Sequence, residues 1–527
     1  MQKLLQLRIP AATAFSEQLL KEEIAEQLQI KTSDTFHIQL IKRSIDARQK
    51  IIHANITVKV FINESLEREE LHFDYKDVSS VSRNCIIIGA GPAGLFAALK
   101  CLELGVKPIV FERGKDVKSR RRDLAAINKE HIVNDESNYC FGEGGAGTYS
   151  DGKLYTRSGK RGDIERILKT LVFHGASSEI LVDAHPHIGT NKLPQIITTI
   201  RETILNKGGE IHFDHKLVDV VIEKDAVKKI VVENLKNGEK KEITSSKIIL
   251  ATGHSARDIY ELFDSKKILL EAKPFAMGVR AEHPQSLIDK VQYHCGSLEE
   301  LNKKRDYLPA ASYSLVHQAN GYGVYSFCMC PGGIIAPCAT SQEEVVTNGW
   351  SPSKRNNPYA NSGIVVGLGL KDFEPYKKFG ALAGLQLQKE LERKAWIKGG
   401  KTQTAPAQRL QDFVNNKISS SLPDCSYQPG TNSVSMPEVL GKLISSSLQL
   451  GFKAFVNKMK GYLTNEAIIV GVESRTSTPV RIPRDNQTLQ HQQLKNLFPC
   501  GEGAGYAGGI VSAAMDGERC AEAANFI

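Results

Sequence analysis

The amino-acid sequence predicts an α/β protein whose central unit binds a dinucleotide. An apolar strand, Cys85–Ile88, runs directly into a glycine-rich turn that opens an apolar helix at about residues 92–104. A second strand, Lys107–Phe111, follows this helix and ends on the acidic residue Glu112. This order matches the βαβ unit in which adenine dinucleotides bind, which consists of a strand, a glycine turn, a helix, a second strand and a carboxylate.

Each residue of the turn Gly89-x-Gly91-x-x-Gly94 has a physical role in such a site. Gly89 permits the tight turn, Gly91 lets the backbone approach a pyrophosphate, and Gly94 lets the helix pack closely on the strand. Pro92 suits a first helical turn, whose unpaired N–H groups and positive dipole end favour phosphates. Glu112 lies 18 residues after Gly94, close to the spacing of about 20 expected for a carboxylate that accepts ribose hydroxyls. A carboxylate there argues against a 2′-phosphate, so the site is not expected to hold NADP.

The length and composition predict a globular protein of several domains. A chain of 527 residues exceeds one ordinary core, and 41% hydrophobic with 24% charged residues is a usual composition. No apolar run approaches the ~18–20 residues of a membrane span, and the first residues lack a secretory signal pattern. The ten cysteines form no CxxC pair and no zinc-ligand spacing. We therefore expect free thiols, a cytoplasmic location and no metal.

The formal net charge of +9 makes nucleic acid a partner to consider. Residues 1–80 are the natural candidate for a binding module, but they carry eleven basic and twelve acidic residues. The positive charge gathers instead at residues 113–129 and 153–169, near the expected pyrophosphate site. The sequence therefore argues against nucleic acid and membranes as partners.

The chain divides into four segments. Residues 1–80 alternate as strand, helix, strand and strand, which predicts a small N-terminal α+β module. A nucleotide-binding domain begins at residues 81–263 and resumes at residues 471–527, where a second glycine-rich motif occurs. Residues 264–470 contain no second dinucleotide fingerprint, so we expect an inserted α+β domain that caps the site or holds the substrate.

Two further motifs of small residues come directly after short predicted strands. Several strands are predicted between residues 210 and 254, with Asn237-Gly238 as a hairpin turn because this pair tolerates the positive φ that such turns need. The last of these strands ends in Thr252-Gly253, where the chain can turn close to a ligand. Near the C-terminus, an apolar strand enters Gly501-Glu502-Gly503, and a glycine-rich loop then opens a helix at about residues 510–523.

With both ends in view, the chain resembles FAD-dependent oxidoreductases with the glutathione-reductase-like fold, in which a Rossmann-type domain carries a β-meander. More closely, it resembles a bacterial family of uncharacterised FAD-dependent dehydrogenases, also named NAD(P)/FAD-dependent oxidoreductases. The motifs that carry the resemblance lie within residues 83–527 and read IIIGAGPAGLFAALKCLELG, FGEGGAGTYSDGKL, ATGHSARD, KPFAMGVRAEHP, FCMCPGG, VESRTSTPVR and CGEGAGYAGGIVSAAMDG.

The resemblance implies FAD as the cofactor and assigns roles to matching residues. Glu112 would bind the adenosine ribose, and backbone near Leu217 would face the adenine. Many such flavoproteins have Asp where this chain has Glu502, whose carboxylate would bind ribityl hydroxyls with a longer reach. The helix start at Gly508–Ile510 would stabilise the anionic reduced flavin through its N–H groups. The implied FAD-binding residues are Gly89, Gly91, Pro92, Ala93, Gly94, Glu112, Leu217, Thr252, Gly253, Gly501, Glu502, Gly508, Gly509 and Ile510.

A third glycine-rich segment, Phe141–Leu154, is predicted to bring backbone close to the flavin or its phosphates, with a surface loop as the alternative. The glycines concerned are Gly144, Gly145 and Gly147. A basic helix expected to begin at Arg113 precedes this segment. Arg113 and Arg121 are candidates for phosphate contacts, with a solvated helix face as the alternative.

Three side chains are candidates for catalysis. Cys330 could act beside the flavin as an acid or thiol relay, or be a buried small hydrophobe; the extended backbone of Cys328-Met329-Cys330 makes a disulfide poorly placed. Arg475 could grip the carboxylate of an anionic substrate or form a structural ion pair. His283 is a candidate general acid. His254, after the Thr252-Gly253 turn, is interpreted as shaping the loop beside the cofactor rather than as an acid or base.

The function predicted from these observations is that of an FAD-dependent oxidoreductase, a dehydrogenase or reductase. It would transfer hydride between flavin N5 and a small-molecule substrate, anionic if Arg475 holds it. With one dinucleotide motif, NAD(P)H could serve only as a transient electron donor. The alternatives are a flavoprotein that binds or modifies a macromolecule (RNA or a protein partner) and a flavin monooxygenase.

Overall fold

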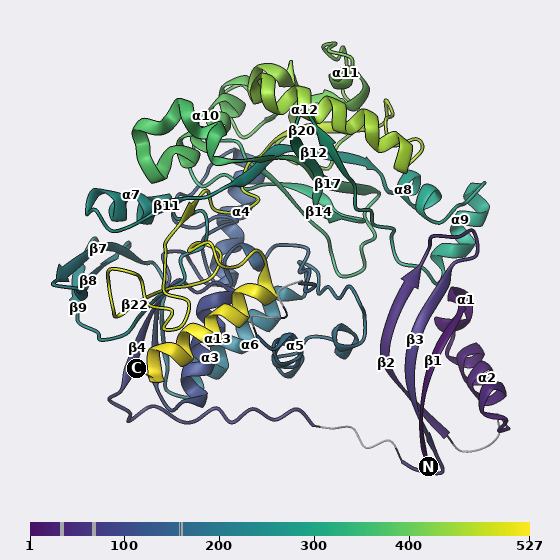
Figure 1. Ribbon diagram of the computed structural model, residues 1–527, viewed down its shortest axis with the longest axis horizontal. Coiled ribbons are helices and arrows are strands. Elements are labelled where there is room, and N and C mark those ends of the chain that lie inside the picture. Colours follow the sequence, from purple (N-terminus) through teal and green to yellow (C-terminus); the bar gives the residue numbers. More distant parts are fainter. Residues whose placement is uncertain (32–35, 66–69, 157–158, 160–161, 527) are drawn as a thin grey trace.

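The computed structural model describes residues 1–31, 36–65, 70–156, 159 and 162–526 (Figure 1). Within these ranges, no helix is both long and apolar enough to cross a membrane. The chain builds a five-stranded parallel sheet and a seven-stranded, mostly antiparallel sheet that lies above it in Figure 1. A small N-terminal module lies to the right of both in that view.

The parallel sheet carries the predicted βαβ unit. Its strand order is β22-β10-β4-β5-β6, with β4 (Asn84–Ile88), β5 (Lys107–Phe111), β6 (Glu210–His212), β10 (Ile248–Leu250) and β22 (Leu497–Pro499). Side chains alternate between the two faces of a strand. Cys85 and Ile87 of β4 therefore enter one core, and Ile86 and Ile88 enter the core on the opposite face. Because both faces are covered, the strand is apolar throughout, as expected for a parallel sheet.

Two helices that lie far apart in the chain pack side by side on the first face. They are α3 (Pro92–Glu103) and α13 (Ile510–Phe526), drawn next to each other in Figure 1. A Cβ added to Gly517 would lie 2.0 Å from the carbonyl oxygen of Ala93, so the two helices meet backbone to backbone. A Cβ added to Gly94 would lie 1.9 Å from the carbonyl oxygen of Gly89. Both contacts exist only because glycine has no side chain.

The opposite face of the sheet packs against a three-stranded antiparallel meander. It consists of β7 (His215–Glu223), β8 (Ala226–Asn234) and β9 (Lys240–Ile243), and α7 (Arg257–Ser265) packs in the same core. β8 and β9 pair antiparallel on either side of Asn237-Gly238, so the predicted hairpin is confirmed, but only Gly238 of this pair has positive φ, at 75°. The β-meander expected from the sequence is therefore present.

The seven-stranded sheet has the order β13-β14-β17-β12-β20-β18-β19. Its strands are β12 (Phe275–Pro284), β13 (Val316–Ala319), β14 (Tyr322–Cys330), β17 (Tyr359–Leu368), β18 (Ala405–Arg409), β19 (Thr431–Ser433) and β20 (Ile468–Glu473). The helices α10 (Ala383–Lys398) and α12 (Met436–Lys458) lie above it in Figure 1, and apolar residues of both join the sheet in one core. The sheet therefore has a separate hydrophobic core from the parallel sheet.

The N-terminal module has the predicted strand, helix, strand, strand order. It contains β1 (Gln2–Pro10), α1 (Ala11–Ala14), α2 (Glu17–Leu28), β2 (Phe36–Asp46) and β3 (His53–Ile62), in the sheet order β1-β3-β2. The Arg43 guanidinium pairs with Asp183 at 2.8 Å, and backbone hydrogen bonds join Arg43 to Val182 and Ala184. These side-chain and backbone contacts attach the module to the part of the chain that packs on the parallel sheet.

The remaining elements connect these units. They are α4 (Val117–Glu130), α5 (Ile164–Phe173), α6 (Leu193–Asn206), α8 (Gln285–Gln292), α9 (Leu298–Arg305), α11 (Leu410–Val414), β11 (Glu271–Ala272), β15 (Ile334–Pro337), β16 (Thr347–Trp350), β21 (Val480–Arg481) and the 3₁₀ segments Gly145–Gly147, Ser178–Leu181 and Leu370–Leu382. The basic helix α4 begins at Val117 and not at Arg113, because the Asp116 carboxylate caps it by accepting the N–H groups of Lys118 and Ser119.

A cluster of buried charges joins the nucleotide-binding part to the seven-stranded sheet. Arg257, at the start of α7, pairs with Glu344 at 2.6 Å and with Glu392 of α10 at 2.5 Å. Arg475, just after β20, pairs with the same two carboxylates at 2.8 and 2.9 Å. Burial raises the pKa of Glu392, but the two guanidinium groups lower it further, to about 2. Two positive and two negative charges therefore balance inside the protein.

Gly517→Ala tests the contact between α3 and α13. On helix propensity alone, the change would stabilise the protein by about 1 kcal/mol. Since the new Cβ would meet the Ala93 carbonyl oxygen, we expect the reverse, a loss of about 1–3 kcal/mol, measured as a lower melting temperature in calorimetry. Gly296→Ala is the control, because its Cβ would meet only the far end of Glu300 at 3.8 Å. A melting temperature raised by Gly517→Ala would contradict the close packing.

Glu392→Gln tests the buried charge cluster. A carboxyl group whose pKa is near 4.5 when unfolded and about 2 when folded stabilises the fold above pH 4.5, and this contribution is lost as the pH falls toward 2. We expect Glu392→Gln to lower the free energy of unfolding by about 3–5 kcal/mol at neutral pH. The difference from the native chain should shrink between pH 4.5 and 2 in denaturant titrations. Glu343→Gln, which breaks an exposed pair with Arg393, should change stability by less than about 1 kcal/mol.

Candidate functional site

A long cavity of about 330 Å³ lies between the two sheets. Residues just beyond the carboxyl ends of β4, β5, β10 and β22 line one side, and residues of β14 and β16 line the other. This is the position in which parallel α/β sheets bind ligands. The volume falls in the range of about 300–1,000 Å³ that is usual for ligand sites.

At one end of the cavity, Glu112 ties three loops together. Its carboxylate accepts the backbone N–H groups of Ala90, Gly114 and Gly142 at 2.8, 2.9 and 2.9 Å. Glu112 is buried at the cavity wall beside Leu217. Each carboxylate oxygen can accept more than one hydrogen bond, so a ribose hydroxyl can join these amides. The loops that meet here follow β4, β5 and α4.

The arginines near this end have different partners from those predicted. Arg113 lines the cavity, but its guanidinium pairs with Glu136 and with Asp258, the latter at 2.9 Å. Arg121 is an exposed residue of α4 and is not among the described residues that line the cavity. Arg120 is the buried one, and it donates to the carbonyl oxygens of Asn138, Glu143 and Gly145 at 2.7–2.9 Å. Arg120 thus holds the third glycine-rich segment in place.

Two glycine turns of the cavity wall lie against each other. A Cβ added to Gly145 would lie 3.2 Å from the Cα atom of Gly91. Gly91 precedes the first turn of α3, so the unpaired N–H groups of that helix start open onto the same space. Gly508 and Gly509, before α13, have nothing within 4 Å of an added Cβ. The space beside Gly508 and Gly509 is therefore open to a ligand.

Most of the predicted cofactor-binding residues line this cavity, and four do not: Arg121 on α4 and three glycines. Gly94, Gly144 and Gly501 lie behind the wall: Gly94 and Gly144 permit close packing, and Gly501 donates its N–H to Asp516 at 2.8 Å. The predicted residues on the wall are Gly89, Gly91, Pro92, Ala93, Glu112, Arg113, Gly145, Gly147, Leu217, Thr252, Gly253, Glu502, Gly508, Gly509 and Ile510. The wall thus contains glycines that admit a close ligand, the starts of α3 and α13, and the carboxylates of Glu112 and Glu502. These features fit an adenine dinucleotide.

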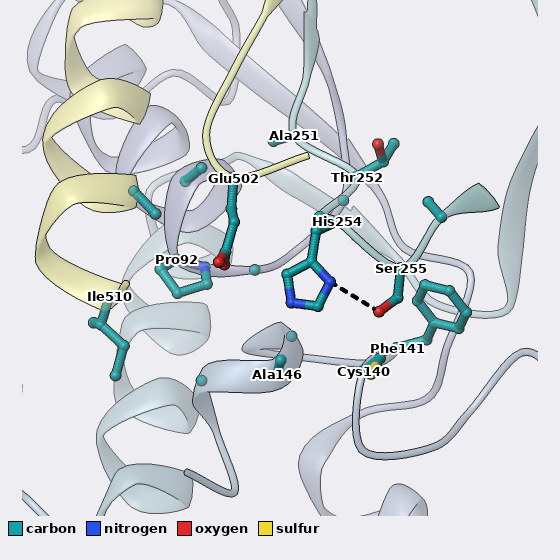
Figure 2. Close-up of a pocket in the computed structure, with 18 of the residues that line it drawn as sticks. Pro92, Cys140, Phe141, Ala146, Ala251, Thr252, His254, Ser255, Glu502 and Ile510 are labelled. Carbon is teal, nitrogen blue, oxygen red and sulfur yellow. Dashed lines mark hydrogen bonds between the residues drawn. The ribbon is translucent and has the colours of Figure 1, made fainter. Parts of the chain in front are cut away.

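Figure 2 shows Glu502 and His254 projecting toward the same space, near Pro92 and opposite the loop that carries Ala146. Burial raises the pKa of the Glu502 carboxyl to about 7. His254 is held by Ser255, whose hydroxyl lies 3.1 Å from Nδ1. The same hydroxyl accepts a hydrogen bond from Arg475, so Ser255 links the imidazole to the Arg475 guanidinium.

Burial and the charges of Arg475 and Arg257 lower the pKa of His254 to about 4. The imidazole is therefore neutral at physiological pH. The sequence interpretation of His254 as a loop-shaping residue missed this arrangement, since both arginines lie far from it in the chain.

At the far end, two cysteines and several charged groups line the cavity. Cys328 is exposed and Cys330 is buried, and both border the cavity with Asn348 of β16. The Lys153 ammonium lies 3.7 Å from the Cys330 sulfur and 3.1 Å from Asp151. The sequence analysis did not single out Lys153, although its position in the polar glycine segment FGEGGAGTYSDGKL was an available signal.

The prediction that Arg475 grips a substrate carboxylate is wrong in its geometry. Arg475 reaches the cavity wall, but its guanidinium already binds Glu344, Glu392, Ser255 and Thr340. The alternative named from the sequence, a structural ion pair, describes these contacts. A single sequence contains no signal for Glu344 and Glu392 as its partners.

The prediction that His283 acts as a general acid is also wrong in its geometry. His283 lies on β12, inside the core of the seven-stranded sheet, and donates Nε2–H to the carbonyl oxygen of Tyr462 at 2.8 Å. It is not among the described residues that line the cavity. Burial lowers its pKa to about 4, so it is a neutral core residue.

Comparison with known sequences agrees with this arrangement. The family described as "Pyridine nucleotide-disulphide oxidoreductase" matches residues 83–271, and "FAD-dependent protein, C-terminal domain-like" matches residues 274–476. A domain of unknown function matches residues 1–61. An uncharacterised protein of Clostridium beijerinckii is 38% identical over 523 residues, which cover 96% of this chain and 95% of the relative.

The solved structures that are similar to this chain are more distant. A geranylgeranyl bacteriochlorophyll reductase-like protein of Thermoplasma acidophilum is 12% identical, with a TM-score of 0.34, over 84% of this chain and 78% of its own. A variant of a flavin-dependent brominase is 13% identical, with a TM-score of 0.32, over 84% of this chain and 79% of its own. The family assignment rests on the sequence matches and not on these two. By those matches, this chain belongs to a family of FAD-dependent oxidoreductases with a Rossmann-type domain, and its cofactor is FAD.

Proposed function

We propose that this protein transfers hydride between the flavin of FAD and a small molecule bound where the cavity reaches the seven-stranded sheet. The observation that carries the proposal is that one cavity is continuous from the glycine turns of the parallel sheet to the polar groups of β14 and β16. When bound, FAD supplies a ring that accepts or donates a hydride at N5. The second sheet supplies the other wall, against which a substrate can be held.

The residues of this chain would orient the cofactor. Gly89, Gly91 and Gly145 would admit the pyrophosphate, and the start of α13 would direct N–H groups at the pyrimidine end of the flavin. Glu502 would accept ribityl hydroxyls. Neutral His254 would form a hydrogen bond in the same space, and its burial, together with the charges of Arg475 and Arg257, keeps the imidazole uncharged.

An anionic substrate is favoured by the charge at the far end of the cavity. Lys153 and Arg355 both pair with Asp151, at 3.1 and 2.8 Å. Two cations therefore share one carboxylate, which leaves one positive charge beside the cavity. Burial opposes ionisation of Asp151, but these two cations hold its pKa well below the usual range. Lys153, rather than Arg475, is thus the cation we assign to the substrate.

Gly91→Ala tests the cofactor site. A Cβ at this position would meet only the Gly145 Cα atom, at 3.9 Å, so the FAD-free protein should keep its melting temperature. The Cβ would point into the path of the pyrophosphate, so we expect FAD to bind at least about tenfold more weakly, a loss of about 1.4 kcal/mol, in calorimetric titration of the FAD-free protein. Gly296→Ala should bind FAD normally. Release of a flavin other than FAD from the purified native protein would contradict the proposal.

The proposed hydride transfer is tested in the absence of oxygen. The reduced holoprotein is mixed with a panel of unsaturated and 2-oxo carboxylates and their uncharged amides, and reoxidation of the flavin is followed by absorbance. We expect saturable reoxidation by at least one carboxylate, and a half-saturating concentration about tenfold higher in Lys153→Met.

Lys303→Met is the control for Lys153→Met, because Lys303 is exposed on α9 and pairs with Glu299 one turn away on the same helix. Reoxidation by oxygen alone, with no response to any organic acceptor or to its charge, would contradict transfer to an anionic small molecule.

A further inference from the structure

The pair Cys328 and Cys330 belongs to the cavity wall but not to the machinery that would hold FAD. Both sulfur-bearing residues end β14 and border the same space as His254 and Gly509. Cys328 is exposed, whereas Cys330 is buried. One thiol is therefore open to molecules entering the cavity, and the other is protected behind it.

The backbone here is not the regular strand expected from the sequence. The register of β14 against β17 shifts between Phe327 and Cys330, so a bulge contains the Cys-Met-Cys segment. In a regular strand, the Cα atoms of residues i and i+2 lie roughly 6.6 Å apart, at the upper end of the range that a disulfide can span. Cys328 has φ 45°, and the Cys330 sulfur lies 3.2 Å from the Cys328 carbonyl oxygen. The Cys330 side chain is thus folded back over the peptide of Cys328.

Two cations lie next to the Cys330 sulfur. The Lys153 ammonium is 3.7 Å away and the Arg280 guanidinium is 4.0 Å away. Burial disfavours the charged form of both cations, yet the carboxylates of Asp151 and Glu473 raise the pKa of Lys153 and of Arg280, respectively. A positive environment of this kind is typical of reactive thiols and not of inert buried ones.

We propose that Cys328 and Cys330 form a second redox centre, a dithiol–disulfide couple that exchanges two electrons with the FAD in the same cavity. In the direction of thiol oxidation, the Cys328 and Cys330 thiols lose two electrons and two protons as the S–S bond forms. The flavin takes up both electrons and one proton, and the second proton passes to solvent. In the reverse direction, the S–S bond breaks and the reduced flavin is reoxidised.

The exposed position of Cys328 assigns a substrate class to this centre. Thiol–disulfide exchange proceeds by attack on an accessible sulfur, so Cys328 is the sulfur that an external thiol or disulfide would reach. The physiological electron donor or acceptor would therefore be a thiol compound. This inference rests on the proposed function, because the flavin is the redox partner of the two thiols.

An anaerobic titration of the holoprotein with dithionite tests the proposal. FAD and one disulfide each take up two electrons, so the oxidised native protein should consume about four electrons per FAD. Cys328→Ser and Cys330→Ser should consume about two. Cys295→Ser is the matched control, because Cys295 lies on a surface loop outside the cavity wall, and it should still consume about four.

Peptide mapping gives a readout that does not depend on the flavin. The FAD-free protein is treated with oxidised glutathione, and its free thiols are alkylated before proteolysis. We expect a disulfide within the peptide that carries Cys328 and Cys330, and its loss after reduction. A disulfide between Cys140 and Cys338 instead would overturn the assignment, since the sulfur of Cys140 also lies near Cys338.

The outcomes separate the two proposals. A preparation that does not bind FAD would sink the proposed function. A protein that binds FAD but consumes only two electrons, or a Cys328→Ser variant that still consumes four, would leave that function intact and overturn the redox role of the cysteines. Retained FAD binding in both serine variants shows that loss of two electrons does not come from misfolding.

Discussion

The backbone contact between α3 and α13 is the constraint on which the cofactor site depends. Because Gly517 has no side chain, α13 lies directly against the Ala93 carbonyl group. The starts of the two helices, at Pro92 and Ile510, therefore open onto one cavity although more than 400 residues of chain separate them. Both positive helix ends are then directed at the same ligand. A larger residue at this contact would separate the phosphate end of the site from the flavin end.

The buried charges of Arg257, Arg475, Glu344 and Glu392 connect this site to the second sheet. They come from α7, the end of β20, a loop and α10, so they hold the two halves of the cavity in one arrangement. Arg475 donates a hydrogen bond to Ser255, which contacts His254 in the cavity wall, and the charges of Arg475 and Arg257 help to lower the pKa of His254. Breaking such a cluster leaves an unpaired buried charge, which costs far more than an exposed pair. The same buried charges therefore contribute both to the stability of the fold and to the neutral state of His254.

The far wall of the cavity combines groups that a simple apolar pocket would not contain. Asp151, Lys153 and Arg355 come from the nucleotide-binding part and a loop before β17, whereas Cys328, Cys330 and Arg280 come from the seven-stranded sheet. Desolvation makes each charge costly, so each has a partner of opposite sign. This end of the cavity therefore differs from the end near Glu112 in having one excess positive charge and two thiols.

The parts of the protein that could be predicted from the sequence are those with local causes. The turn at Gly89, Gly91 and Gly94, the strand ending at Glu112 and the β-meander follow from residues adjacent in the chain, because turns, helix starts and alternating strands depend on short-range sterics and hydrogen bonds. The roles of Arg475, His283 and Arg121 could not be predicted in this way. Whether an arginine or histidine faces a cavity depends on partners hundreds of residues away, and only the packing of the two sheets brought Glu392 to Arg475, Tyr462 to His283 and Lys153 to Cys330.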